Sequence, residues 1–107
     1  MFSSLIVAKM DPASAARVAA IFADFDSTDM PGAMGTRRRE LFTYRGLYFH
    51  LQDFESDHGA DRIESAKQDA RFVRISADLR PYITAYDPNW RSPADAMATR
   101  FYHWAAS

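Results

Sequence analysis

The stretch RRRELFTYRGLYFHLQDF, residues 37–54, decides the fold class of this chain. Residues 37–45 and 47–54 are both rich in aromatic and other strand-favouring side chains, and only Gly46 separates them. Two segments of this kind that meet at a single glycine predict two antiparallel strands joined by a tight hairpin. We therefore expect an antiparallel sheet with this hairpin at its centre.

The residues before the hairpin predict a strand followed by a helix. Residues 2–10 alternate loosely between apolar and polar side chains, which is typical of a half-buried strand. Asp11 and Pro12 form a helix start signal, and apolar residues then recur at spacings of three and four until the helix ends near Asp26. The stretch STDMPGAMG, residues 27–35, is predicted to be a loop because proline and glycine interrupt it.

The residues after the hairpin predict more helix and then a last strand. Residues 55–69 carry one helical stripe of apolar side chains, and a second stripe follows until Pro81 ends the helix. Residues 80–96 hold three prolines and three aromatic side chains, so we expect an ordered but irregular segment. The stretch MATRFYHWAA, residues 97–106, is predicted to be the last strand.

The resulting order is βαββαβ, which is the pattern of a ferredoxin-like α+β fold with a four-stranded antiparallel sheet and helices on one face. With 107 residues and 12.2 kDa, the chain corresponds to one domain, residues 1–107. The other face of the sheet must carry some of the many aromatic side chains, and an exposed aromatic face is typical of an interface. We therefore expect a homodimer joined sheet to sheet.

Composition excludes several classes of function. The chain carries 13 Lys and Arg against 14 Asp and Glu, which argues against nucleic acid and membrane surfaces as partners. It has no cysteine, so disulfides, cysteine zinc ligands and thiol nucleophiles are excluded. The start of the chain has no basic segment and too short an apolar run for a signal peptide, and no apolar stretch could span a bilayer. We expect a soluble cytoplasmic protein.

Metal and cofactor signals are weak. The histidines His50, His58 and His103 are far apart, and none has a second histidine or a carboxylate at metal-ligand spacing. Only four glycines are present, none of them in a phosphate-binding loop, and no serine has the context of a nucleophile elbow. We therefore expect neither a metal nor a cofactor.

Two residues are candidates for acid–base chemistry. His50 lies mid-strand and shares a strand face with Tyr48 and Gln52, so it is either a buried core or interface histidine or a general acid or base in an aromatic pocket. Asp26 lies where the first helix ends, facing the negative end of the helix dipole. Its charge there is unfavourable for folding, which points to a functional use unless water solvates it.

Arginines and late aromatic residues supply candidate binding groups. Strand alternation places Arg37 and Arg39 on one face and Arg38 on the other, so at least one arginine faces away from solvent. It either forms an ion pair or binds an enolate, phenolate or carboxylate. Five aromatic residues near the end of the chain serve either packing or a flat aromatic ligand: Tyr82, Tyr86, Trp90, Tyr102 and Trp104.

The stretch FADFDSTDMPGAMGTRRRELFTYRGLYFHLQD, residues 22–53, resembles the central segment of the type II polyketide cyclases of the tetracenomycin cyclase family. That family has an aspartate after the first helix, a loop with threonine and proline, a glycine, a triple arginine and a Leu-Tyr-x-His-Leu strand. The segments LIVAKMDP, residues 5–12, and RFYHWAA, residues 100–106, are similar as well. The resemblance covers nearly the whole chain.

The resemblance implies a cofactor-free dimeric α+β barrel that closes rings on a poly-β-ketone by intramolecular aldol condensation and dehydration. Carried over by position, it implies catalytic roles for Asp26, Arg39 and His50. Arg39 is the electrostatic clamp on an enolate, while Asp26 or His50 moves protons. The substrate-binding candidates are aromatic or imidazole side chains: Tyr48, Tyr82, Trp90, His103 and Trp104.

Two positions depart from the family pattern. One relative has a histidine before the aspartate, where this chain has Phe25, so one acid–base candidate is missing and a two-histidine mechanism is in doubt. His103 stands where a small polar residue is expected and could compensate. Two other functions fit the same scaffold: a cofactor-free monooxygenase acting on an anthrone-type intermediate, and a binding module without catalysis. Transient contact with a polyketide synthase or an acyl carrier protein is a further implied partnership.

Overall fold

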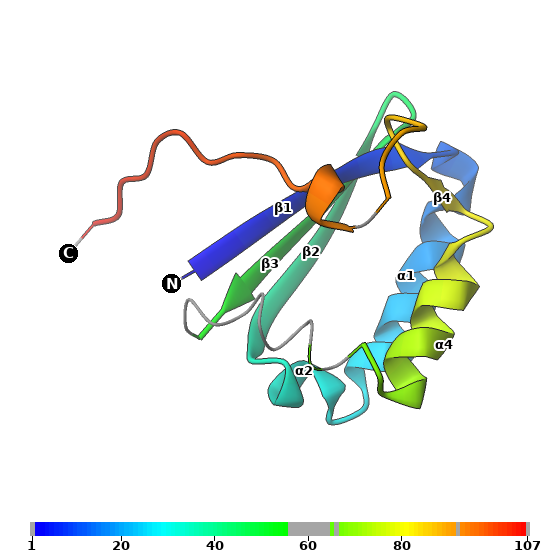
Figure 1. The fold of residues 1–107 in the computed structure, drawn as a ribbon, viewed down its shortest axis with the longest axis horizontal. Coiled ribbons are helices and arrows are strands. Elements are labelled where there is room, and N and C mark those ends of the chain that lie inside the picture. Colours follow the sequence, from blue (N-terminus) through cyan, green and yellow to red (C-terminus); the bar gives the residue numbers. More distant parts are fainter. Residues whose placement is uncertain (1, 56–64, 66, 92, 107) are drawn as a thin grey trace.

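The central hairpin forms as predicted. In the computed structural model, which describes residues 2–55, 65, 67–91 and 93–106, strand β2 (Thr36–Tyr44) pairs antiparallel with β3 (Leu47–Phe54) (Figure 1). The two residues between the strands both have left-handed backbone, with φ of 48° at Arg45 and 81° at Gly46. A two-residue turn of this handedness matches the twist of the flanking strands, so the glycine fixes the hairpin register.

Two further strands complete the sheet. Strand β1 (Phe2–Met10) pairs antiparallel with β3 along its length, and the short strand β4 (Ile83–Thr84) pairs with the end of β1. The order across the sheet is β2-β3-β1-β4. The expected α+β fold with a four-stranded antiparallel sheet is therefore confirmed.

The helices lie on one face of the sheet (Figure 1). The Asp11 carboxylate accepts a hydrogen bond from the Ala13 amide at 2.9 Å and caps a 3₁₀ turn (η1, Pro12–Ser14), from which α1 (Ala15–Asp26) continues. Helix α4 (Ala70–Leu79) is capped by the carboxylate of Asp69 and packs beside α1. Within the described residues, no helix has the length and the apolar run that a membrane crossing requires.

The prediction of a loop over residues 27–35 is wrong in part, because a short helix, α2 (Met30–Ala33), lies within it. The Thr28 hydroxyl accepts a hydrogen bond from the Met30 amide at 3.2 Å, and Pro31 occupies an early helical position where its missing N–H costs nothing. Proline was therefore a helix start signal here. The helix predicted over residues 55–69 lies largely outside the described residues.

The prediction of a last strand over residues 97–106 is also wrong for the single chain. Met97 forms an isolated bridge with Ile6, and the Ala98 amide donates to the Leu5 carbonyl at 2.7 Å, but residues 98–106 then leave the sheet (Figure 1). A strand needs a neighbouring strand for its backbone hydrogen bonds, and alternation in the sequence does not supply one. The segment expected to be irregular, residues 80–96, provides the edge strand β4 instead, followed by a 3₁₀ turn (η2, Pro93–Ala96).

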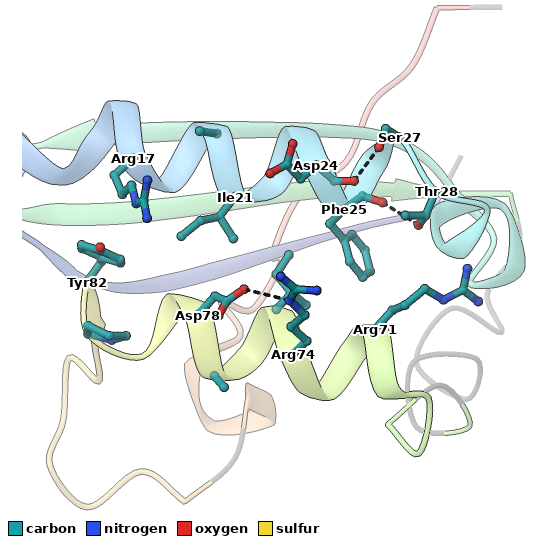
Figure 2. Close-up of a pocket in the computed structure, with 14 residues that line it drawn as sticks. Arg17, Ile21, Asp24, Phe25, Ser27, Thr28, Arg71, Arg74, Asp78 and Tyr82 are labelled. Carbon is teal, nitrogen blue, oxygen red and sulfur yellow. Dashed lines mark hydrogen bonds and ion pairs between the residues drawn. The ribbon is translucent and has the colours of Figure 1, made fainter.

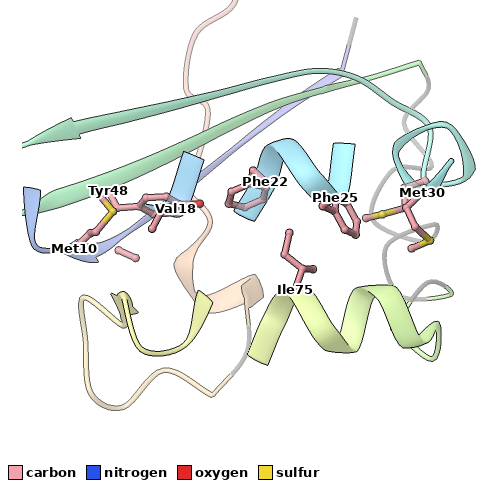
Figure 3. Packing of buried hydrophobic residues seen from close by; sticks show 9 residues of the cluster. Met10, Val18, Phe22, Phe25, Met30, Tyr48 and Ile75 are labelled. Carbon is pink, nitrogen blue, oxygen red and sulfur yellow. The ribbon is translucent and has the colours of Figure 1, made fainter. Parts of the chain in front are cut away.

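The core lies between the sheet and α1 (Figure 3). Helix α1 contributes its apolar stripe, Val18, Phe22 and Phe25, whereas Ile75 is the buried residue of α4. Residues of the sheet and of the α2 segment complete the cluster: Ala8, Met10, Met30, Met34 and Tyr48. Phe72 and Leu79 of α4 pack against the edge of this cluster and are only partly buried.

The opposite face of the sheet is apolar apart from a charged end at Arg38, Glu40 and Asp53, and no described element covers it. Leu5 pairs with Leu51, Val7 pairs with Phe49, and directly paired residues share a face of an antiparallel sheet. Phe42 and Tyr44 of β2 lie on the same face and are 50% and 61% exposed. The sequence-based expectation of a bare aromatic face is therefore confirmed.

Candidate functional site

A largely apolar cavity of about 460 Å³ lies between the inner face of the sheet, α1 and α4. Its volume is in the range typical of small-molecule sites. The apolar wall comes from the sheet, both helices and the α2 segment, and includes Ala8, Phe22, Phe25, Met34, Ile75 and Leu79. Trp90, from the segment after β4, also lines the cavity.

Arg39 is the cationic group of this cavity. Its side chain is only 8% exposed, and its guanidinium binds the Asp26 carboxylate through Nε at 3.2 and 3.1 Å and through Nη2 at 3.0 Å. Asp26 is the last residue of α1, where a negative charge is unfavourable next to the negative end of the helix. The cation from β2 offsets this and anchors the helix end to the sheet.

His50 is held by the same guanidinium. The Nη1 of Arg39 lies 2.9 Å from the Nε2 of His50. Since arginine stays protonated and only donates, Nε2 accepts and the ring proton resides on Nδ1. Burial of the ring, and secondly the Arg39 charge, lower the pKa of His50 from 6.5 to about 3. His50 is therefore a neutral imidazole at physiological pH.

Aromatic rings surround this polar group. The Arg39 guanidinium lies 5.0 Å from the ring centre of Phe22 and 5.8 Å from that of Phe25, which are cation–π distances. The His50 ring contacts the rings of Phe22 and Tyr48 edge-on, at 5.1 and 6.2 Å between centres. Phe25 thus occupies its position as an apolar support for Arg39.

Tyr48 supplies a buried phenol beside His50. Its side chain is 3% exposed and lines the cavity. Burial raises the pKa of the Tyr48 phenol well above its usual value, and the Arg39 charge offsets this only in part. The hydroxyl therefore keeps its proton and can donate a hydrogen bond to a ligand oxygen.

The structure separates the remaining predicted site residues. Trp90 lines the cavity with Arg39, His50 and Tyr48, whereas Asp26 joins them only through Arg39. Tyr82 lines a different groove, on the outside of α1 and α4 (Figure 2). His103 and Trp104 lie on the exposed tail, where Trp104 is 72% exposed, and do not line the cavity of the single chain.

The outer groove is larger, about 840 Å³, but it is lined by charged side chains, some of which pair with one another. It is lined by side chains of both helices that face outward, including Arg17, Asp24 and Arg74 (Figure 2). Arg74 lies 3.8 Å from Asp78 in the next turn, an exposed pair that contributes little. The buried polar groups with perturbed pKa values lie in the inner cavity, which is therefore the candidate site.

The triple arginine divides between the two faces of the sheet. A bulge between Thr36 and Arg38 interrupts the alternation, and Arg37 is exposed there. Arg38 lies on the outer face, where its Nε is 2.9 Å from the buried Asp53 carboxylate and 3.4 Å from that of Glu40. Arg39 is thus the arginine of the three that enters the cavity, as the resemblance implied.

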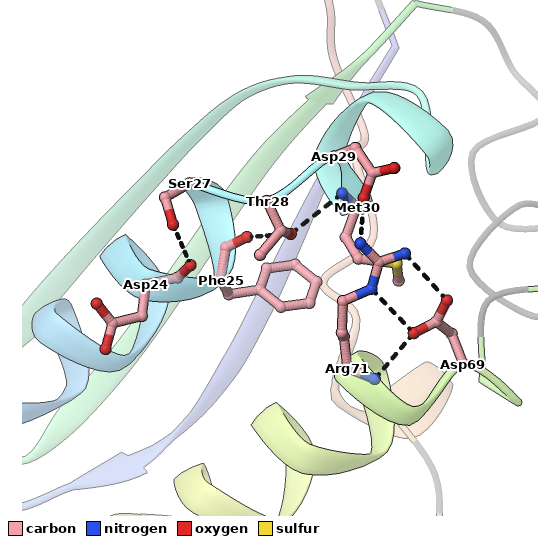
Figure 4. Close-up of polar contacts among 8 residues, drawn as sticks. All are labelled: Asp24, Phe25, Ser27, Thr28, Asp29, Met30, Asp69 and Arg71. Carbon is pink, nitrogen blue, oxygen red and sulfur yellow. Dashed lines mark hydrogen bonds and ion pairs between the residues drawn. The ribbon is translucent and has the colours of Figure 1, made fainter.

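A second arginine ties the helices together near the site (Figure 4). Arg71, at the start of α4, binds the Asp69 carboxylate through its amide, Nε and Nη2, and binds Asp29 through Nη1. Hydrogen bonds from Arg71 lower the pKa of Asp69. Because Asp29 belongs to the connection between α1 and α2, this contact fixes α4 against the end of α1 that carries Asp26.

Sequence reasoning missed part of the cavity wall. Phe22, Met34 and Ile75 line it, and their helical spacing or apolar nature could not distinguish them from ordinary core residues. Ser76 of α4 also lines the cavity, and no pattern in the sequence indicated this. Among the described residues, no three His, Cys, Asp or Glu side chains are grouped so as to hold a metal ion.

Comparison with known proteins identifies the family. The model of the polyketide synthesis cyclases matches residues 2–105 of the chain. The chain is 37% identical to tetracenomycin F2 cyclase of Streptomyces glaucescens over 105 residues, covering 98% of this chain and 95% of that protein. It is also 37% identical over 105 residues to polyketide synthase CurG of Streptomyces cyaneus, covering 97% of each.

The solved structures agree with this result. The structure of tetracenomycin F2 cyclase, described as a type II polyketide cyclase, matches with a TM-score of 0.93 at 36% identity and covers 100% of both chains. An antibiotic biosynthesis monooxygenase matches with a TM-score of 0.50 at 10% identity, covering 77% of this chain and 86% of the other, which shows a shared fold alone. The chain therefore belongs to the polyketide synthesis cyclase family, as its central motif implied.

Proposed function

We propose that this cyclase closes a ring on a poly-β-ketone by intramolecular aldol condensation followed by loss of water, without a cofactor. The observation that carries the proposal is the guanidinium of Arg39, held between Asp26 and His50 at the wall of an apolar cavity. A fixed cation in a low-dielectric site stabilises a developing enolate or alkoxide oxygen more strongly than water does.

The shape of the cavity supplies most of the proposed rate acceleration. A methylene between two ketones is already acidic, so no strong base is required. An apolar cavity with aromatic walls folds the flexible chain so that the nucleophilic carbon meets the ketone carbon, and it excludes competing foldings. The expected acid–base contribution is correspondingly modest.

We assign a distinct role to each polar group, and the tautomer of His50 supports this assignment. His50, neutral with its proton on Nδ1, donates a hydrogen bond to the ketone oxygen that becomes the alkoxide. Asp26 is the carboxylate that takes the methylene proton once substrate oxygens replace it on Arg39. The enolate carbon then bonds to the ketone carbon as the π bond of the ketone breaks, and the resulting alkoxide takes back the proton held on Asp26. The hydroxyl leaves with a hydrogen from the adjacent carbon as water, and a carbon–carbon double bond forms.

A product assay tests this function. The chelator-treated protein is mixed with the products of a minimal aromatic polyketide synthase, with and without air, and the products are resolved by mass. The proposal predicts a new product lighter by one water that forms equally well without air. A product that gains oxygen and requires air would instead make the protein a monooxygenase, and no new product would favour a binding module.

We also propose that the protein acts as a homodimer that uses the bare sheet face. That face carries the exposed Phe42 and Tyr44, and the tail beyond Met97 carries Phe101 and Trp104, 97% and 72% exposed. Isolated apolar surface of this extent favours burial against a second copy, with exchange of the tail as the means of completing the sheet. We expect a transient contact with the synthase or its acyl carrier protein to deliver the substrate.

Sedimentation tests the dimer. The intact chain is expected to sediment as a dimer at micromolar concentration, whereas removal of residues 98–107 weakens the association. An Arg17→Ala variant is the control, because Arg17 lies exposed on the outer side of α1, away from both the bare sheet face and the tail. A monomeric intact chain would contradict the proposal.

A further inference from the structure

Gln52 is a buried amide that the fold itself does not use. Its side chain is only 5% exposed and lines the cavity from β3. Within the described residues its amide takes part in no side-chain hydrogen bond, and the amide atoms are open to the cavity, unlike the enclosed Ser4 hydroxyl. An amide that faces a cavity and has no partner in the fold is available to bind a ligand oxygen.

The neighbours of Gln52 define where its amide acts. In the register of the sheet, Gln52 lies directly opposite Arg39 on β2 and opposite Ser4 on β1, and it shares the inner face with His50 two residues away. The Ser4 hydroxyl is itself buried without a hydrogen bond, so the two neighbours do not satisfy each other. Arg39, by contrast, already binds two groups.

We propose that Gln52 binds a second oxygen of the substrate, placed in a 1,3 relation to the oxygen that Arg39 binds. Cβ atoms of directly opposite residues in antiparallel strands lie about 5 Å apart. That separation suits the alternate oxygens of a poly-β-ketone. This inference rests on the proposed function, because it assigns the substrate class to the same cavity.

An amide suits this position better than a second charge. Its oxygen accepts from an enol or phenol and its nitrogen donates to a ketone, so Gln52 binds either tautomer of a 1,3-diketone. A site that hydrogen-bonds a particular oxygen discriminates strongly against substrates that lack it, because its own polar group then stays unsatisfied. Gln52 is therefore a specificity-determining residue that selects the folding in which two successive oxygens face the sheet.

Binding of two aromatic probes tests the proposal without turnover. The probes are 1,3-dihydroxynaphthalene, which has two oxygens in the required relation, and 1-naphthol, which has one. Calorimetry on wild type and Gln52→Met is expected to show about fivefold weaker binding of the diol and unchanged binding of 1-naphthol. Gln52→Met is also expected to melt at or above the wild-type temperature, because the fold does not use the amide for a hydrogen bond of its own.

Ser4→Ala is the matched control, because Ser4 is the cross-strand neighbour that could pair with Gln52 in a purely structural role. It is expected to leave binding of both probes unchanged. Three results would overturn the inference. Gln52→Met could lose affinity equally for both probes, it could lose affinity for neither, or Ser4→Ala could lose as much affinity for the diol as Gln52→Met does.

The proposed cyclase function and the inference about Gln52 can be tested independently of each other. If the wild type produces no cyclised product but Gln52→Met still loses affinity for the diol alone, the binding role stands and the cyclase function does not. If the wild type cyclises its substrate and Gln52→Met binds the diol and distributes products as the wild type does, only the inference about Gln52 is wrong.

Discussion

At the scale of single residues, one arginine organises the site. Arg39 binds the end of α1 through Asp26, sets the tautomer of His50 and packs on Phe22 and Phe25. Lysine could supply the charge but not this planar fork of donors. The residue that is expected to stabilise the transition state is thus also the residue that positions its neighbours.

Substitutions at the polar group are expected to reduce activity only in part. We predict that Arg39→Lys and His50→Ala each lower kcat/KM about 10- to 100-fold, because the shape of the cavity still brings the reacting carbons together. Steady-state kinetics checks this, with circular dichroism as the folding control. Complete loss of activity in a folded His50→Ala protein would make His50 indispensable and contradict this account.

The buried state of His50 predicts a dependence of stability on pH. Its pKa is about 3 in the folded protein against 6.5 ordinarily, so below pH 6.5 the unfolded chain binds a proton that the folded chain does not. The free energy of unfolding contributed by this residue is fully present above pH 6.5. It falls by up to about 1.4 kcal/mol per pH unit as the pH drops from there towards 3.

Urea unfolding of wild type and His50→Gln at several pH values isolates this effect. The difference in unfolding free energy between the two proteins is expected to stay constant from pH 8 to 7. From pH 6.5 to 5, the wild type is expected to lose stability relative to His50→Gln. A difference that does not change with pH would show that His50 titrates normally.

The sequence analysis identified these polar residues as candidates but did not predict the contacts between their side chains. Arg39 and His50 both lie on predicted strands, yet only the register between β2 and β3 brings their side chains together. The bulge that displaces Arg37 from the alternation has no signature in the sequence. The contact between Asp26 and Arg39 depends on how α1 lies across the sheet, which local patterns do not determine.

At the scale of elements, the hairpin between β2 and β3 positions Arg39 against His50 and Gln52. Its turn holds Arg45 and Gly46 at positive φ, a conformation that glycine adopts freely and arginine does not. Any change in this turn that shifted the register by one residue would exchange the two faces of the strands.

Two substitutions in the turn are expected to have opposite effects. Gly46→Ala is predicted to destabilise the protein by about 1 kcal/mol through backbone strain alone, since nothing lies within 4 Å of an added Cβ. Arg45→Asn is predicted to stabilise it by several tenths of a kcal/mol, because asparagine tolerates the left-handed region. Chemical denaturation checks both, and equal stability of Gly46→Ala and wild type would contradict the turn geometry.

Elements with a local signal were predicted well, and elements that depend on distant partners were not. Residues 2–10, the hairpin and α4 follow from periodicity and start signals in the sequence itself. The strand β4 has only two residues, and its existence depends on the free edge of β1. The tail beyond Met97 alternates like a strand, but its pairing with the edge of β1 stops after Met97 and Ala98.

At the scale of the whole molecule, the fold separates two surfaces that could each bind a ligand. The inner cavity holds Arg39, His50 and Tyr48 between the sheet and the helices, and the charged groove runs outside α1 and α4. The central claim is that chemistry takes place in the inner cavity because its shape confines the substrate. Neighbouring positions on α4 allow the two surfaces to be compared directly.

Ser76 lines the inner cavity, Ala77 lines the outer groove, and both side chains are exposed enough to accept a larger residue. The most direct measurement is the rate of water loss from the polyketide substrate in Ser76→Trp and Ala77→Trp, with thermal unfolding as the folding control. We predict at least a tenfold slower reaction, or a changed product distribution, in Ser76→Trp and wild-type behaviour in Ala77→Trp. Unchanged activity in Ser76→Trp with loss in Ala77→Trp would place the chemistry outside the cavity.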